Sequence, residues 1–106
     1  MKNTKWSDAD RKIARRAFDA ALQRECAALV EQFRTSAAQV KNLDDIWVIN
    51  DYLTEQRKLI GRKYDYRYSQ LIFLFGQLLR EKFIEAQDIE GLSEEKLQYI
   101  HHLAAL

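Results

Sequence analysis

Residues 7–41 read SDADRKIARRAFDAALQRECAALVEQFRTSAAQVK, and this stretch decides the fold. It contains neither proline nor glycine, and its apolar residues recur at steps of three and four, which predicts one continuous amphipathic helix. Ser7 is the expected N-cap, and Asp10 stands where a capping box has its acid. A helix of about 34 residues would be roughly 50 Å long. So small a chain cannot cover it alone, so we expect a coiled-coil-like partner: the next helix, a second protomer, or both.

The rest of the chain continues the helical pattern. There is no proline, there are only three glycines, and no run alternates apolar and polar residues long enough to predict a strand, so the expected fold class is all-α. Asn42 or Asp44 is expected to cap a second helix after a short turn, which favours an antiparallel hairpin. Helices at 71–84 and 93–104 follow a connection at 64–69. The helix at 71–84 is apolar nearly all round, so we expect most of it to be buried.

These elements predict one all-helical domain over residues 1–106. The long helical hairpin is expected at residues 7–64 and a small helical head at residues 65–106. Because the first helix is long and the chain is short, an oligomer would be a natural way to complete the core.

The charge balance excludes some classes of protein. With 17 basic and 16 acidic residues the net charge is +1, which argues against a protein that binds nucleic acid by neutralising phosphates. A basic cluster between Arg57 and Arg67, interleaved with tyrosines, keeps base stacking as a minor alternative. No apolar run predicts a membrane span and no signal region is seen, so we expect a cytoplasmic protein. The one cysteine, Cys26, fits a reducing compartment and is expected as a small hydrophobe on a buried helix face.

No pattern in the chain predicts catalysis. Glu-x-x-His, Cys-x-x-Cys, His-x-x-x-His and glycine-rich phosphate loops are all missing from the sequence. The adjacent His101 and His102 would point about 100° apart on a helix, so they cannot easily share a metal ion. We therefore expect no catalytic residues, no metal and no cofactor.

The strongest sign of binding lies in the second helix. Trp47 and Asp51 are four residues apart and share a face, Asn50 lies beside them, and Arg57 follows within two turns. One interpretation is an ion pair inside a dimer with the tryptophan packed over it. The other is a recognition patch whose arginine reaches a partner carboxylate or aromatic ring. Periodicity favours neither.

Many residues occur together in an order that is specific as a set. They are Trp6-Ser7, Ala17-Phe18, Arg24-Glu25, Asp44-Asp45-Ile46-Trp47, Asp51-Tyr52-Leu53, Arg57, Gly61-x-Lys63-Tyr64-Asp65, Arg67, Ser69, Ile72-Phe73, Phe75, Gln77-Leu78-Leu79 and Leu103-Ala104-x-Leu106. In this combination the chain resembles the fluorescence recovery protein family of cyanobacteria.

The resemblance implies an elongated helical dimer with a head at each end, and a regulator without enzymatic activity or cofactor. It implies binding to photoactivated orange carotenoid protein, mainly to its C-terminal domain. Such binding detaches that protein from the phycobilisome, ends quenching and speeds the return to the resting orange form. The family's recognition patch corresponds to Trp47, Asp51 and Arg57, and a second contact region on the head includes Phe73.

The chain departs from the family pattern at two positions. Asn50 stands where the family commonly has histidine, and Tyr99 stands at a basic position of the head. Asparagine donates and accepts hydrogen bonds but cannot carry a histidine's charge. The alternative is therefore a relative with the same fold that binds a different protein in an organism lacking the carotenoid protein.

Overall fold

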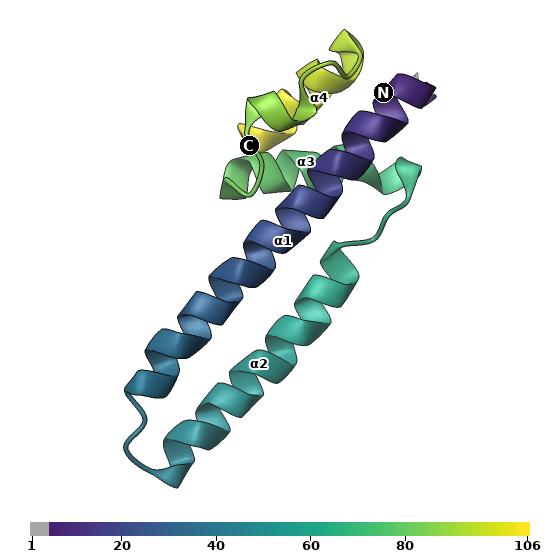
Figure 1. The fold of residues 1–106 in the computed structure, drawn as a ribbon. Coiled ribbons are helices and arrows are strands. Elements are labelled where there is room, and N and C mark those ends of the chain that lie inside the picture. Colours follow the sequence, from purple (N-terminus) through teal and green to yellow (C-terminus); the bar gives the residue numbers. More distant parts are fainter. Residues whose placement is uncertain (1–4) are drawn as a thin grey trace.

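The structure is a computed structural model that describes residues 5–106. These residues form four α-helices and one short 3-10 helix, with no strand among them, so the predicted all-α class is confirmed (Figure 1). The elements are α1 (Asp8–Ala38), α2 (Leu43–Lys63), α3 (Tyr68–Glu81), η1 (Ala86–Ile89) and α4 (Glu94–Ala104). The molecule is elongated, with extents of 54 × 26 × 22 Å.

Local capping chemistry sets the start of α1. The Asp10 amide donates to Ser7 Oγ at 3.0 Å, and the Ser7 amide donates to Asp10 Oδ2 at 3.4 Å, which completes a capping box. The helix then runs for 31 residues, or about 46 Å. The predicted start and the absence of a break are confirmed, but the helix ends at Ala38, three residues before the expected end near Lys41.

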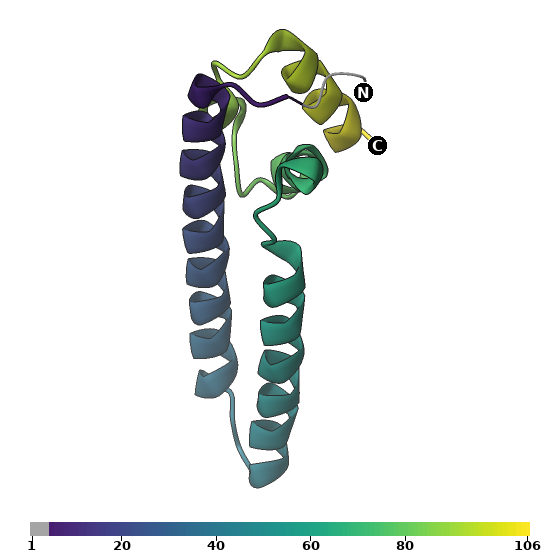
Figure 2. The same ribbon diagram turned by 90° about the vertical axis from the view of Figure 1, so that its right-hand side faces the viewer.

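Helices α1 and α2 lie side by side and antiparallel, joined by a short turn at the end away from the head (Figures 1 and 2). Asn42 caps α2 by accepting from the Asp45 amide at 3.1 Å, and Asp45 in turn accepts from the Lys41 amide at 2.9 Å. The sequence predicted either Asn42 or Asp44 as the cap, and the structure has Asn42.

Few side chains are buried in the half of the hairpin that lies away from the head. Every buried residue of α1 lies between Asp10 and Ala21, and α2 has no buried residue at all. Cys26 is exposed in the single chain, so the prediction of a buried cysteine is wrong. The reason is that the head covers only the first part of α1.

The core lies in the head, where α3 and α4 pack against each other and against the start of α1 (Figure 2). Gly76 allows α3 and α4 to approach closely, since a Cβ at this position would lie 2.7 Å from Leu103 Cβ. The apolar residues of α3 are mostly buried, as predicted. They are Leu71, Ile72, Leu74, Phe75 and Leu78.

One ion pair is enclosed in the head. Lys96 is 2% exposed as a residue, and its ammonium lies 3.3 Å from Asp10 Oδ2 and donates to the Lys5 carbonyl at 2.6 Å. Asp10 Oδ1 also accepts from the Ser93 amide at 3.3 Å. The first turn of α1 is thereby fastened to α4.

The bounds of α3 differ from the expected 71–84. The helix begins at Tyr68 and ends at Glu81, because Lys82 adopts a left-handed conformation with φ of 68°. Its amide bonds back to the carbonyls of Leu78 and Leu79 and closes the helix. Glycine is the usual residue at such a position, so nothing in the sequence predicted this end.

Candidate functional site

Trp47 points away from α1. The α2 residues that are half-buried against α1 include Ile49, Leu53 and Ile60, and these lie about 120° to 160° around the helix from Trp47. Trp47 is 54% exposed. It therefore presents a large, unpartnered apolar surface to solvent near the outer end of the hairpin.

Arg57 and Asp51 do not pair with each other. Within residues 5–106 neither side chain has a hydrogen bond or an ion pair, and six residues of helix separate them by about 120° around the axis. Arg57 lies instead within about 20° of Asn50, two turns along the same line. The α2 surface thus carries Trp47 and Asp51 on one line, and Asn50 and Arg57 on a neighbouring one.

Thr54 lies between these two lines, and its side chain is hydrogen-bonded to the backbone. Its hydroxyl donates to the Asn50 carbonyl at 2.9 Å. No hydrogen bond of the Asn50 side chain occurs among the described residues, so its amide is available to a partner.

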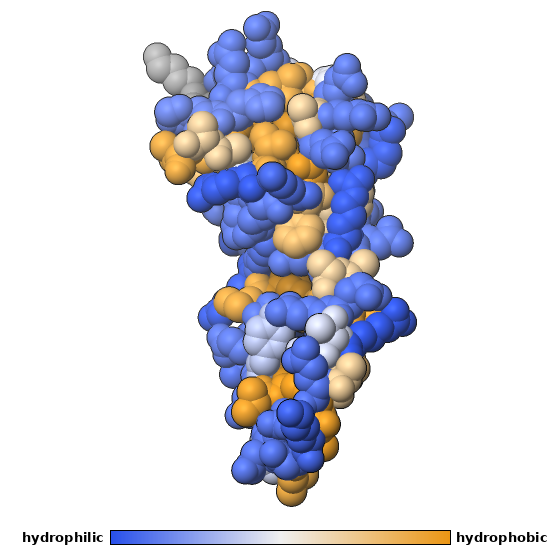
Figure 3. Space-filling model, turned by 90° about the vertical axis from the view of Figure 1, so that its left-hand side faces the viewer, coloured by the Kyte–Doolittle hydropathy of each residue, from blue (hydrophilic) through white to orange (hydrophobic). Residues whose placement is uncertain are grey.

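Other exposed apolar side chains lie in the first two turns of α2, at the outer end of the hairpin. Leu43 is 59% and Val48 67% exposed. Figure 3 shows such hydrophobic patches, in orange, on the narrow lower part of the molecule as well as on the head. Exposed apolar surface of this kind is typical of protein contacts.

Phe73, the fifth predicted residue, lies on a different surface. It belongs to the outer side of α3, is 53% exposed, and meets Tyr99 of α4 edge to face with ring centroids 6.3 Å apart. The predicted residues are therefore distributed over two surfaces, one on α2 and one on the head, and do not line a common pocket.

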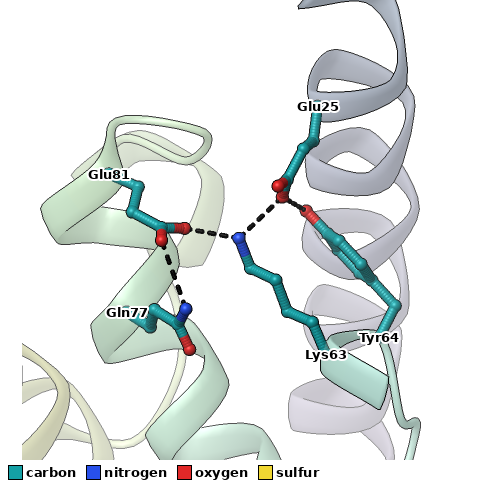
Figure 4. Close-up of polar contacts among 5 residues, drawn as sticks. All are labelled: Glu25, Lys63, Tyr64, Gln77 and Glu81. Carbon is teal, nitrogen blue, oxygen red and sulfur yellow. Dashed lines mark hydrogen bonds and ion pairs between the residues drawn. The ribbon is translucent and has the colours of Figure 1, made fainter. Parts of the chain in front are cut away.

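A polar joint fixes how the head sits on the hairpin (Figure 4). Lys63 Nζ lies 2.7 Å from Glu25 Oε1 and 2.5 Å from Glu81 Oε1. The Tyr64 hydroxyl donates to Glu25 at 2.6 Å, and Gln77 Nε2 donates to Glu81 at 3.2 Å. Burial, and then the bond to Glu25, raise the pKa of Tyr64, so its hydroxyl stays a donor.

A second fastening connects the middle of α1 to η1. The Arg24 guanidinium donates to both Asp88 oxygens, at 2.8 and 3.2 Å, and to the Phe83 carbonyl at 2.9 Å. The hydrogen bonds from this guanidinium lower the pKa of Asp88, and Asp88 raises the pKa of Arg24. The sequence did not predict either fastening, because their members are far apart in the chain.

An aromatic cluster holds the connection between α2 and α3 onto α1. Phe18 meets Tyr66 edge to face at 4.9 Å, and the Arg15 guanidinium lies 4.5 Å from the Tyr66 ring centre. Burial, followed by the neighbouring Tyr68, raises the pKa of Tyr66 to about 12. These tyrosines pack on protein, which disfavours the alternative in which they stack on bases.

The basic cluster is broken up by acids. Lys63 is bound to two carboxylates, and the Arg67 guanidinium lies 2.6 Å from Asp65 Oδ2. Among residues 5–106 no three metal-ligating side chains come together. In the same part of the chain, no helix combines the length and the hydropathy needed to cross a bilayer.

Comparison with known proteins gives one consistent result. A family model described as the photoprotection regulator fluorescence recovery protein matches residues 6–104. The fluorescence recovery protein of Synechocystis sp. (strain ATCC 27184 / PCC 6803 / Kazusa) is 38% identical over 101 residues, which are 95% of this chain and 93% of that protein.

Solved structures of such proteins match almost end to end. The fluorescence recovery protein of Fremyella diplosiphon is 36% identical with a TM-score of 0.89, and the match covers 96% of this chain and 100% of that one. The Synechocystis structure is 37% identical, with the same TM-score and the same shares of both chains covered.

Proposed function

We propose a function on the premise that this chain belongs to the fluorescence recovery protein family, a family of photoprotection regulators, as the match over residues 6–104 shows. The protein acts without covalent chemistry or cofactor. It binds photoactivated orange carotenoid protein, mainly through that protein's C-terminal domain. Binding accelerates the return to the resting orange form and so ends quenching at the phycobilisome. The resemblance noted in the sequence is confirmed at the level of the family.

One observation carries the assignment of the binding surface. Trp47 is 54% exposed on the side of α2 that faces away from α1, and Arg57, on the adjoining line, has no partner within residues 5–106. Tryptophan and arginine are the residue types most enriched among interface residues with large binding energies. Among residues 5–106 neither side chain has a structural role that would explain its presence.

Each of these side chains makes a different contact with the partner. Trp47 supplies the apolar anchor, and Arg57 makes a charge-assisted hydrogen bond to a partner carboxylate. Asn50 adds a hydrogen bond beside Arg57, and Asp51 contacts the partner on the Trp47 line. Phe73 makes a second contact from the head.

The uncovered half of the hairpin supports a homodimer. Val30 and Phe33 of α1 and Leu59 of α2 are 43–49% exposed, beyond the region that the head buries. A second copy that covers these residues would complete the core and give an elongated dimer. Phe33→Glu is then expected to give the mass of one chain in sedimentation at micromolar concentration, whereas Lys41→Glu, in the exposed turn, keeps the mass of two.

The decisive experiment removes the arginine. Arg57→Ala is expected to leave helicity and dimer mass unchanged and to abolish the acceleration of orange-form recovery. Lys12→Ala, which removes an exposed cation of α1, keeps full activity. Full activity of Arg57→Ala would reject the assignment of this surface.

Asn50 favours a second candidate function. Because the family commonly has histidine there, the chain could serve a different protein partner in an organism without the carotenoid protein. Size exclusion of a mixture with purified photoactivated carotenoid protein separates the two candidates. A complex supports the first, and the elution of two separate proteins supports the second.

A further inference from the structure

A shallow groove of about 250 Å³ lies where the end of α2, the connection and α3 meet. Its rim carries Arg62 from α2 and Arg67 from the connection, and its α3 wall carries Gln70, Phe73 and Gln77. We call it the Arg62–Phe73 groove. It lies beside the polar joint of Figure 4, since Lys63 and Gln77 also line it.

The cations of the groove are not equally engaged. Lys63 is bound to Glu25 and Glu81 and is 13% exposed, so it belongs to the joint. Arg67 pairs with Asp65 at the surface, where the two side chains are 65% and 42% exposed. Such an exposed pair contributes little to stability because water screens it, so Arg67 can exchange Asp65 for another carboxylate at little cost.

Arg62 is the uncommitted cation. It is exposed and has no hydrogen bond or ion pair with any residue of the described part of the chain. The groove thus offers one free guanidinium and one that can exchange its partner. Both have the planar fork that binds carboxylates through two parallel hydrogen bonds.

The apolar part of the groove is Phe73. This ring is 53% exposed, whereas the neighbouring apolar residues Ile72 and Leu74 are 4% and 6% exposed. Gln70 and Gln77 precede and follow Phe73 on the same face of α3, at spacings of three and four. The groove therefore combines a single exposed ring with amide groups and guanidinium groups.

We propose that the Arg62–Phe73 groove receives a segment of the protein partner in which a carboxylate stands next to an aliphatic or aromatic side chain. The carboxylate binds Arg62 and draws Arg67 from Asp65, and the apolar side chain packs on Phe73. This inference rests on the proposed function, because the segment belongs to the partner that docks on α2.

Charge selects this occupant over a nucleic acid. Asp65 lines the groove and Glu81 lies next to it, so successive phosphates would meet carboxylates. Neutralising several phosphates needs several free cations, and this groove has one. A segment with one carboxylate and one apolar side chain matches what the groove presents.

The groove is continuous with the α2 surface. Eleven residues of helix separate Asp51 from Arg62, which places them within about 20° around α2 and about 17 Å apart along it. A partner that covers Trp47 and Asp51 can therefore follow the same side of α2 into the groove. Linking two contacts in this way strengthens binding beyond either contact alone.

The first test uses a short peptide, so it does not depend on the carotenoid protein. An octapeptide of alternating Glu and Leu is titrated into the labelled protein while amide shifts are followed by NMR. Shifts that centre on residues 62–77, and that vanish when Gln replaces Glu in the peptide, support the proposal. Absent shifts, or equal shifts with the Gln peptide, would overturn it. Equal shifts with a single-stranded oligonucleotide would overturn the assignment to a protein segment.

The second test measures affinity for photoactivated carotenoid protein. Arg62→Glu is expected to weaken binding by at least about tenfold, since it places a carboxylate against a carboxylate. Lys12→Glu makes the same charge change on α1 and is expected to stay within about twofold. If the wild-type protein binds and Arg62→Glu binds equally well, the groove is rejected and the proposed function stands. If the wild-type protein does not bind, the proposed function fails, and the peptide titration decides on the groove.

Discussion

The ammonium of Lys63 lies 2.7 Å from the Glu25 carboxylate, which joins the last residue of α2 to the middle of α1. The same ammonium reaches Glu81 of α3, so one side chain holds three helices together. Because the Lys63 and Glu25 side chains are only 13% and 19% exposed, water screens this contact poorly. The joint therefore sets the orientation of the head relative to the α2 surface.

Lys63→Met is expected to lower the free energy of unfolding by about 1–3 kcal/mol, since it leaves the half-buried Glu25 carboxylate and the Glu81 carboxylate without their cation. Urea unfolding followed by circular dichroism measures the change. The comparison variant is Lys58→Met, at an exposed position of α2 whose side chain has no partner among residues 5–106. Equal stabilities of the two variants would contradict the role of the joint.

Two glycines give opposite predictions for the same substitution. At Gly76 an added Cβ would lie 2.7 Å from Leu103 Cβ, so Gly76→Ala is expected to cost about 1–3 kcal/mol by forcing α3 and α4 apart. At Gly61 nothing lies within 4 Å of the added atom, so Gly61→Ala is expected to stabilise α2 by about 0.5–1 kcal/mol. Thermal unfolding of both variants checks the signs. A gain in stability for Gly76→Ala would show that the two helices do not pack as described.

The enclosed ion pair predicts a large effect at the start of α1. Asp10→Ala is expected to destabilise the protein by about 3–5 kcal/mol, because Lys96 would remain buried without its carboxylate. Asp19→Ala is the matched control, since Asp19 pairs with Arg15 where both side chains are more than half exposed. Chemical unfolding of each variant is compared with the parent. Similar losses in both variants would mean that burial of Lys96 adds nothing.

The Arg24–Asp88 contact predicts a dependence on pH. The folded state lowers the pKa of Asp88 from its ordinary value of 3.8. The contact therefore contributes stability above that ordinary value and loses it as the pH falls through the lower folded-state pKa. The gap in unfolding free energy between the parent and Asp88→Asn should therefore be present at about pH 6 and shrink towards about pH 2.5. Urea titrations across this range test the sign. A gap that widens with acid would contradict it.

Features that depend on nearby residues were predictable from the sequence. Ser7 and Asp10 form their capping box across three residues, and Asn42 caps α2 across three residues. The apolar density of residues 71–78 predicted a mostly buried segment without knowledge of its neighbours, and Phe73 is its exposed apolar exception. Exposure of Trp47 and Arg57 also fits the expected recognition patch.

Features that depend on distant contacts were not predictable in this way. Lys63 meets Glu25 across 38 residues and Glu81 across 18, and no spacing rule connects such positions. The end of α3 was misplaced because Lys82 adopts a conformation that glycine usually marks. The apolar periodicity of α1 continues past Ala21, but periodicity does not say where cover by the head ends, so Cys26 was wrongly expected to be buried.

That uneven cover along α1 has a consequence for how the molecule opens. Amide hydrogens of the head, which sit over the buried core, should exchange with solvent only on global unfolding, whereas those near the Asn42 turn should exchange through local fraying. If a second copy covers the outer hairpin, the exchange there slows as protein concentration rises, while exchange in the head stays constant. Amide hydrogen exchange would thus report self-association in the outer hairpin and global stability in the head.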